Sequence, residues 1–311
     1  MAETNIREAV AEINVVGILS EKNLELVNEG TDKECIRGSM TLKTSDISFI
    51  ELNVFVNKFT KSGAESKAYP GICTVMDTYK SIADVGEENA TVVSVRKGRI
   101  QPQTYYSTKT NNFGDSVRYS ANFFNTAKPE EEFGNNGCIE GYVKAKRPEL
   151  DKEGEETGRL IVTLLVPTYN CIEPIEIIAD NKPDANDNNW ADLIDSYYDI
   201  GASGMFYITA VNEAHQVVKE IPMLGGTVRK ETETHYERGI VITGASEPYE
   251  SEDGGKGWSD EIIRKALVER EAVLEDRKNK AIAKENGGAK PASATNSSAG
   301  AAAGRSMPWS M

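Results

Sequence analysis

The chain has 311 residues, 39% of them hydrophobic, and a formal net charge of −14. It contains no run of about 18 or more apolar residues, which a membrane-spanning helix requires. Its first residues lack the basic region and apolar core of a secretory signal peptide. We therefore expect a protein that stays in the cytoplasm, that of the host if the source is a virus, and that does not contact membranes.

The cysteines and histidines do not have the spacing of a metal site. Cys35, Cys73, Cys138 and Cys171 are far apart and form no C-x-x-C pair. The two histidines, His215 and His235, are too few and too scattered to suggest zinc ligands. We expect reduced, structural thiols, no metal and no cofactor.

The first 250 residues are dominated by short runs in which Val, Ile, Tyr, Phe and Thr alternate with polar residues, a pattern typical of strands. In chain order the first set consists of strands at 15–19 and 49–57, a helix at 77–86, and strands at 90–98 and 116–124. The second set consists of strands at 139–143 and 171–179, a helix at 189–201, and strands at 204–212 and 235–243. The same order of elements therefore occurs twice.

With two of the three strands before the helix identified in each set, this is interpreted as the element order of an OB-fold (three strands, a helix and two strands), a five-stranded, partly open barrel that binds oligonucleotides or oligosaccharides. Gly17 and Gly141 fall inside the first strand of each set, where a residue without Cβ eases a sharp bend. We predict a mainly β protein with one OB-fold in residues 1–126 and another in 127–250. The alternative is an unrelated β-sandwich or two structural β domains.

The remaining residues differ in composition. Residues 251–286 read as a linker followed by an amphipathic helix from about 259, capped by Ser259 and stopped by Gly287. Its apolar stripe is expected to dock on a barrel or on a second copy of the helix. Residues 287–311 are rich in Ala, Gly and Ser, a composition that predicts disorder, and end in an apolar tip.

The negative charge is concentrated in the second barrel. Residues 1–126 carry 14 basic and 16 acidic side chains, residues 127–250 carry 11 and 24, and residues 251–311 carry 10 and 9. Attraction to phosphates comes from cations, so any nucleic-acid-binding face is expected on the first barrel. The second barrel is expected to be a structural or protein-binding partner.

Binding a single strand without sequence preference requires cations along the phosphates and aromatic rings on which bases stack. Residues 96–126 interleave both kinds of side chain with a single acid, Asp115. The predicted nucleic-acid-binding residues are Phe55, Asn57, Phe59, Arg96, Lys97, Arg99, Tyr105, Tyr106, Lys109, Phe113, Arg118 and Phe124.

Alternation along the strands predicts which of these side chains share a face, because adjacent strand residues point to opposite sides. In residues 51–59 the aliphatic positions must face the core, which turns Phe55 outward between two asparagines. In residues 116–124 the same rule places Arg118 and Phe124 outward and Tyr119 and Phe123 in the core. The alternative is that Phe55 and Phe124 pack on a loop or on the second domain.

The element order resembles that of tandem OB-fold single-stranded-DNA-binding proteins of the replication protein A kind, and of phage and bacterial single-strand-binding proteins. The resemblance implies a partner of single-stranded DNA, with RNA left open, and a tail tip that recruits replication, recombination or repair proteins. The tip here is Met307, Pro308, Trp309 and Met311. It lacks the acidic side chains of the bacterial tips.

Two functions follow from these observations. The first is a non-catalytic single-stranded-DNA-binding protein, viral in one reading, that coats exposed strands and recruits partners through its tail. The second is a structural or assembly protein, such as a virion component, built from two β domains. The sequence has no phosphate-binding P-loop, nucleophile elbow or H-E-x-x-H motif. We therefore expect no enzymatic activity.

Overall fold

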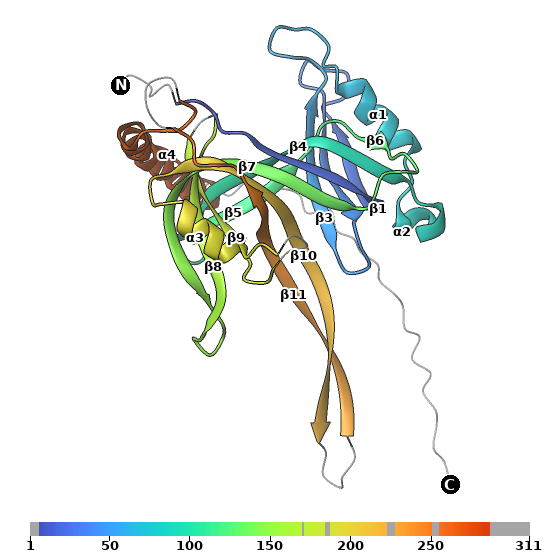
Figure 1. Cartoon of the computed structure of the whole chain (residues 1–311). Helices are drawn as coiled ribbons and strands as arrows, with labels where there is room; N and C mark the ends of the chain where they lie inside the picture. Colours follow the sequence, from blue (N-terminus) through green and yellow to red (C-terminus); the bar gives the residue numbers. More distant parts are fainter. Residues whose placement is uncertain (1–5, 170, 184–186, 223–227, 251–254, 287–311) are drawn as a thin grey trace, which may run out of the picture.

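The computed structural model describes residues 6–169, 171–183, 187–222, 228–250 and 255–286. Over these residues the chain is mainly β (Figure 1). The first unit contains β1 (Ala11–Val27), β2 (Cys35–Lys43), β3 (Phe49–Asn57), α1 (Tyr69–Thr78), α2 (Ile82–Val85), the short 3-10 helix η1 (Glu87–Asn89), β4 (Val92–Ser107), β5 (Asn112–Ser120) and β6 (Asn125–Thr126). The second contains β7 (Gly134–Leu150), β8 (Glu156–Pro167), β9 (Ile172–Ala179), α3 (Trp190–Tyr197), β10 (Ser203–Pro222) and β11 (Val228–Ala245).

The strand pairing of the first unit closes a barrel. β1 pairs antiparallel with β2, and β2 with β3. β3 runs parallel to β5, β5 pairs antiparallel with β4, and β4 returns to β1. This closed order, with helices between its third and fourth strands, is that of an OB-fold.

The second unit repeats this topology strand for strand. β7, β8 and β9 form an antiparallel meander, β9 pairs parallel with β11, and β10 pairs antiparallel with both β11 and β7. Helix α3 again lies between the third and fourth strands. The predicted fold of two tandem OB barrels is therefore confirmed.

The two barrels are joined by their first strands. Residues Ala11 to Val16 of β1 pair antiparallel with residues 134–139 of β7, so the strands form one continuous eleven-stranded sheet within the described residues. A second junction lies at the start of β3, where the Asn212 side chain donates a 2.6 Å hydrogen bond to the Phe49 carbonyl. Buried residues of both barrels belong to one hydrophobic cluster. The barrels are thus held together over a broad junction.

Gly17 and Gly141 occupy equivalent places in the two barrels. A Cβ at Gly17 would lie 2.5 Å from the Lys43 carbonyl oxygen, and one at Gly141 would lie 2.9 Å from Leu164 Cβ. Both neighbours belong to the adjoining second strand of the same barrel. Glycine is needed at these positions because the first strand approaches the second too closely for a side chain.

The helix predicted at residues 77–86 is wrong in its bounds. α1 begins earlier, at Tyr69, and ends at Thr78, and only the short α2 falls inside the predicted range. Pro70 lies in the first turn of α1, where its missing N–H has no hydrogen-bond partner to lose. The predicted helix at 189–201 is present as the shorter α3, capped by the Asn189 side chain.

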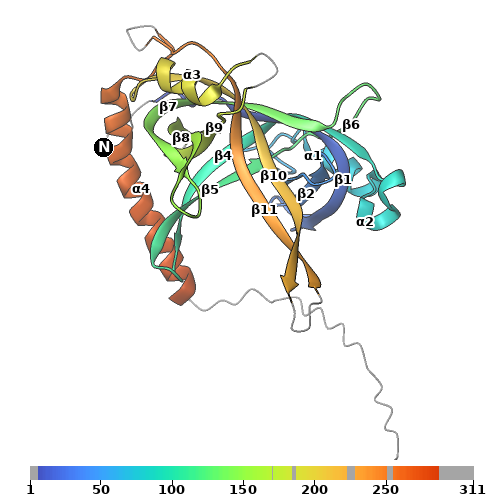
Figure 2. The same ribbon diagram turned by 60° about the horizontal axis from the view of Figure 1, so that its bottom comes forward.

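Helix α4 (Asp260–Asn286) docks along the outside of the second barrel and against β4 (Figure 2). At its start, Trp258, Ile263 and Ala266 form an apolar cluster with Leu165 and Ile172. The expected docking on a barrel is therefore observed.

Further along, the buried face of α4 is ionic. The Glu173 carboxylate of β9 is 2% exposed and lies 2.6 Å from the Arg277 guanidinium and 3.8 Å from that of Arg270. Arg277 and Arg270 also donate hydrogen bonds to the backbone and side-chain oxygens of Thr104 on β4. This Glu173 network ties α4 to both barrels.

The hairpin of β10 and β11 extends well beyond its barrel as a two-stranded arm (Figure 1). Its ladder runs without interruption from Ile208↔Ile242 to Pro222↔Val228. All four cysteines, which are described, are free thiols. In the part of the chain that is described, no helix is long and apolar enough to cross a membrane.

Candidate nucleic-acid interface

The outer surface of β2, β3, β5 and β4 presents a continuous row of polar, cationic and aromatic side chains, which we call the sheet face. Between β2 and β3, Arg37 lies opposite Phe55 and Ser39 lies opposite Asn53. Asn53 in turn is paired with Ser120 of β5, and Ser120 is paired with Arg99 of β4. The next rung pairs Arg118 with Gln101. The sheet face comprises Arg37, Ser39, Asn53, Phe55, Arg99, Gln101, Arg118 and Ser120.

Phe55 is the aromatic side chain of the sheet face. Burial alternates without a break along β3, so that Leu52, Val54 and Val56 are buried and Phe55 is 59% exposed. The outward orientation predicted from the alternation is therefore what the structure shows. Such a ring, with no core to fill, is available as a platform on which a base can stack.

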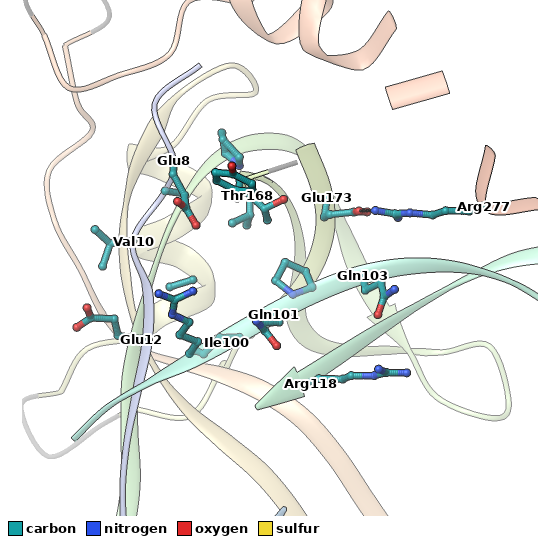
Figure 3. Close-up of a pocket in the computed structure, with 17 residues that line it drawn as sticks. Glu8, Val10, Glu12, Ile100, Gln101, Gln103, Arg118, Thr168, Glu173 and Arg277 are labelled. Carbon is teal, nitrogen blue, oxygen red and sulfur yellow. Dashed lines mark ion pairs between the residues drawn. The ribbon is translucent and has the colours of Figure 1, made fainter. Parts of the chain in front are cut away.

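Arg99 and Arg118 are the cations of the sheet face whose charge is not already neutralised. Among the residues described, neither forms an ion pair or donates a hydrogen bond. Arg99 and Arg118 both line a cavity of about 560 Å³ bounded by β1, β4, β5 and the end of β8. Gln101 and Gln103 project from β4 beside Arg118 of β5 (Figure 3).

Arg118 also lines a second depression, of about 860 Å³, between the two barrels. Its first-barrel wall includes Asn53 and Arg118, and its second-barrel wall includes Glu176, Asn212 and Arg238. The Arg238 guanidinium donates to the Asn212 side chain at 3.2 Å. Arg118 therefore stands where the sheet face meets the groove between the barrels.

Arg96 and Lys97 lie at the end of the sheet face, at an irregularity in the pairing of β4 with β1. Lys97 has a positive φ of 55°, and its backbone N–H donates to the Asn14 side chain. The Arg96 guanidinium lies 2.5 Å from the Glu131 carboxylate and lowers the pKa of that carboxyl group. Arg96 is exposed, but its charge is paired within the protein, unlike those of Arg99 and Arg118.

The aromatic residues predicted in the long loop lie on the hairpin of β4 and β5. Tyr105 pairs with Gly114 in the ladder, and Tyr106 packs edge-on against Phe113 with ring centroids 5.1 Å apart. Tyr105 and Phe113 are exposed, and Lys109 is exposed in the connecting turn. Tyr105 lies on the same face of β4 as Arg99, Gln101 and Gln103 and continues the sheet face toward the end of the hairpin. Tyr106 and Phe113 lie on the opposite face, where the Lys278 ammonium of α4 is 5.9 Å from the Tyr106 ring.

The prediction that Phe124 faces outward and Phe123 the core is wrong. Phe124 is 8% exposed and belongs to the hydrophobic core, whereas Phe123 is exposed. β5 ends at Ser120, and alternation does not continue through the irregular residues that follow. Beyond the end of a strand, a shift of one residue is enough to move a side chain from the solvent side to the core side.

The other predicted residues are placed as follows. Asn57 is exposed at the end of β3, opposite Cys35, and Phe59 is an exposed ring 5.7 Å from the Lys58 ammonium. Tyr119 is partly buried against the core, and burial raises its pKa to about 12. Met307, Pro308, Trp309 and Met311 lie outside the described residues.

Sequence reasoning missed Arg37, which lies directly opposite Phe55 in the ladder of β2 and β3. The signal was present, because Ile36, Met40 and Leu42 are the buried positions of β2 and leave Arg37 outward. Its guanidinium forms an exposed 2.5 Å ion pair with Glu25. An exposed pair of this kind contributes little, about 0 to 1 kcal/mol, so a phosphate can compete for Arg37 at low cost.

The strand pairing and the sheet face define the class: a tandem OB-fold protein whose first barrel has an exposed aromatic and cationic face. The chain belongs to the YorF family, whose family model matches residues 10–280. No curated protein matches the sequence.

Among solved structures, the chain is similar to the single-stranded DNA binding protein of Thermus aquaticus. A deletion variant matches with 10% identity and a TM-score of 0.47, covering 79% of this chain and 97% of that one. The wild-type form matches with 9% identity and a TM-score of 0.46, covering 78% of this chain and 94% of that one. A replication protein A heterotrimer bound to single-stranded DNA gives 10% identity, a TM-score of 0.19, and coverages of 80% and 68%. Since these TM-scores are below 0.5, the fold assignment rests on the strand pairing.

Proposed function

We propose that this protein binds single-stranded DNA on the sheet face of its first barrel, without catalysis, and coats exposed strands in replication and recombination. The observation that carries the proposal is that Arg99 and Arg118, which have no ion-pair partner among the described residues, lie on the same sheet face as the exposed ring of Phe55. Each stacked base contributes about 1–3 kcal/mol, and cations that contact phosphates release counterions.

The net negative charge of the second barrel supports the proposal that the principal DNA contacts lie on the first barrel. Residues 127–250 carry 24 acidic side chains against 11 basic ones. Two cations of its β7 and β8 hairpin already have partners, Lys146 with Asp195 at 2.7 Å and Arg147 with Glu176 at 3.0 Å, whereas Lys144 and Lys152 form no ion pair among the described residues. The groove between the barrels next to Arg118 is lined by the carboxylates of Glu51, Asp115 and Glu176 as well as by Asn212 and Arg238, and these acids disfavour a continuation of the strand onto the second barrel.

We extend the proposal to the C-terminal tip, which would recruit replication, recombination or repair proteins through Trp309 and Met311. Its sequence supports an apolar contact, because there is no carboxylate side chain after Glu285. Deleting residues 287–311 should leave DNA binding intact or strengthen it, while abolishing capture of a partner.

The experiment is a titration of fluorescent oligo-dT with untagged protein at several salt concentrations. Arg118→Ala and Arg99→Ala should each weaken binding and reduce the slope of log K against log salt by about 0.7, the value for one phosphate contact on a single strand. Phe55→Ala should weaken binding about 5- to 150-fold.

Matched controls come from the second barrel. Lys152→Ala removes an exposed cation from the turn between β7 and β8, and Tyr197→Ala removes an aromatic side chain that is 67% exposed on α3. Both should bind oligo-dT like the wild type. No binding at micromolar protein in low salt would overturn the proposal, and so would equal losses for the control variants.

A further inference from the structure

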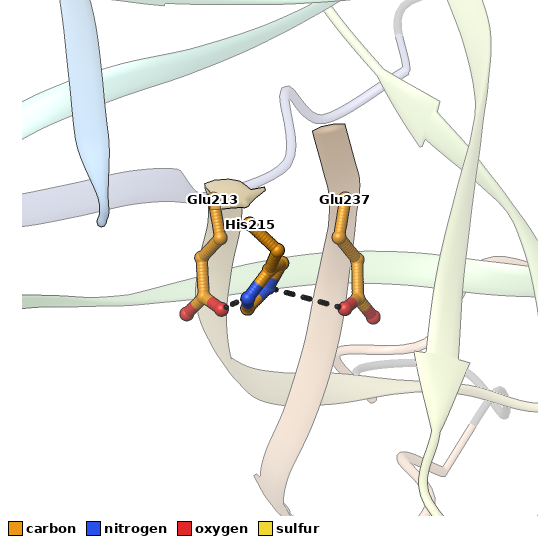
Figure 4. A group of neighbouring side chains, drawn as sticks. All are labelled: Glu213, His215 and Glu237. Atoms are coloured by element: carbon orange, nitrogen blue, oxygen red, sulfur yellow. Dashed lines mark ion pairs between the residues drawn. The ribbon is translucent and has the colours of Figure 1, made fainter. Parts of the chain in front are cut away.

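The arm carries a cluster of potential metal ligands that is unrelated to the sheet face (Figure 4). Glu213 and His215 come from β10, and Glu237 comes from β11. His215 Nε2 lies 3.0 Å from Glu213 Oε2 and 3.8 Å from Glu237 Oε2. The three side chains offer one nitrogen and two carboxylate oxygens within 4.8 Å of one another.

The register of the arm explains how the cluster arises. Glu213 lies directly opposite Glu237 in the antiparallel ladder, and residue 215 shares a face with residue 213 because side chains alternate along a strand. The residue opposite His215 is His235, so both histidines of the chain fall on one rung. Like charges directly opposite each other destabilise a ladder, so the Glu213 and Glu237 rung calls for a cation between its carboxylates.

The His215 imidazole forms no hydrogen bond of ordinary geometry with either carboxylate. Its Nε2 atom is buried, although the side chain is 41% exposed, and it has no hydrogen-bond partner in the described part of the chain. Arg159 approaches the other Glu237 oxygen, Oε1, at 3.9 Å. The Glu237 Oε2 atom therefore faces Nε2, and Nε2 and the two carboxylate oxygens converge on one space.

We propose that Glu213, His215 and Glu237 bind a divalent transition-metal ion, with Zn²⁺ as the best match to their chemistry. Zn²⁺ takes imidazole nitrogen and carboxylate oxygen ligands at about 2.0 to 2.2 Å. Two such ligands of one ion lie roughly 3 to 4 Å apart, and Nε2 of His215 lies at 3.0 Å and 3.8 Å from the two carboxylate oxygens. Three protein ligands leave a position open for water or for a further ligand.

The ion would join the two strands of the arm. The Glu213 and Glu237 rung lies at the base of the arm, where Glu213 also forms a bridge with Ser48 and the Ala214 N–H donates to the Ile47 carbonyl. The two-stranded ribbon beyond this base is only marginally stable on its own. An ion that binds the paired arm but not the separated strands stabilises the pairing by mass action. The metal therefore fixes the shape of the arm, and it does so whether or not the sheet face binds DNA.

The test is a Zn²⁺ titration of untagged, fully reduced full-length protein against a chromophoric chelator. The wild type should bind one equivalent of Zn²⁺. His215→Ala and Glu237→Gln should each lower the Zn²⁺ affinity more than about 100-fold, which exceeds the roughly 10- to 100-fold loss expected for an outer-shell partner. Glu247→Gln, which removes an exposed acid outside the arm, should bind like the wild type.

Hydrogen exchange gives a second readout that does not depend on ligand affinity. Zn²⁺ should slow exchange of the β10 and β11 amides around the Glu213 and Glu237 rung in the wild type and leave them unchanged in His215→Ala. A circular dichroism spectrum identical to the wild type shows that each variant is folded. Equal Zn²⁺ affinity of the wild type and His215→Ala, or no stoichiometric binding at micromolar Zn²⁺, would overturn the proposal.

Discussion

Arg277→Ala should release α4 from the barrels, because it removes the nearest partner of a buried carboxylate. Glu173 is 2% exposed, and the Arg277 guanidinium lies 2.6 Å from it. Removing one partner of a buried pair costs about 3 to 5 kcal/mol. Here Arg270 remains at 3.8 Å and the Thr104 N–H at 3.2 Å, so we expect a smaller cost of about 2 kcal/mol.

Hydrogen exchange of the α4 amides measures this cost locally, whereas a two-barrel protein has no single well-defined unfolding free energy. A loss of about 2 kcal/mol should accelerate exchange of the protected α4 amides roughly 30-fold. Amides in the core of the first barrel should exchange as in the wild type.

Lys280→Ala is the matched control, because Lys280 is exposed on the same helix and, among the residues that the structure describes, pairs with Asp276 alone, at 2.6 Å. It should leave α4 exchange unchanged. The reasoning would be refuted if Arg277→Ala left α4 protection unchanged, or if both substitutions accelerated exchange equally.

Three further predictions concern stability and reactivity. The Tyr69 hydroxyl and the Gly30 N–H bond to Glu34 and hold the pKa of its carboxyl group below the usual 4.5. This contribution is present above pH 4.5 and is lost as the pH falls through the lowered pKa, so the urea midpoints of the wild type and Glu34→Gln should converge on acidification. Urea midpoints that move apart as the pH falls would contradict this assignment. Burial raises the pKa of the Cys171 thiol to about 11, so iodoacetamide at pH 8 should modify it far more slowly in the folded protein than in urea. Gly141→Ala should lower the urea midpoint, because its Cβ would lie 2.9 Å from Leu164 Cβ. Gly71→Ala adds a Cβ into open space on α1 and serves as the control, which should leave the midpoint unchanged or raise it.

The architecture could be predicted from the sequence because buried and exposed residues alternate regularly along each strand and because the order of elements repeats. Unbroken alternation in β3 was enough to place Phe55 outward, and the repeated order of elements was enough to predict two barrels. The same rule failed at Phe123 and Phe124, because β5 ends at Ser120 and irregular backbone has no period. Helix α1 was not predicted; it begins at Tyr69 and carries Pro70 in its first turn, where proline is tolerated.

Contacts between distant segments could not be predicted from one sequence. The Glu173 network joins residues 104, 173, 270 and 277, and neither charge pattern nor spacing indicates which acid an arginine on α4 will meet. The Glu213, His215 and Glu237 cluster was likewise hidden. His215 and His235 are far apart in sequence, and only the register of β10 and β11 shows that they share a rung.

Photo-crosslinking of single-stranded DNA tests the central claim most directly. An oligo-dT that carries iodo-deoxyuridine would be irradiated with the full-length protein and the crosslinked peptides mapped by mass spectrometry. We predict crosslinks at Phe55 and at the aromatic side chains of the β4 and β5 hairpin, with the Phe55 crosslink lost in Arg99→Ala/Arg118→Ala at moderate salt. Crosslinks confined to the second barrel or to α4 would contradict the account.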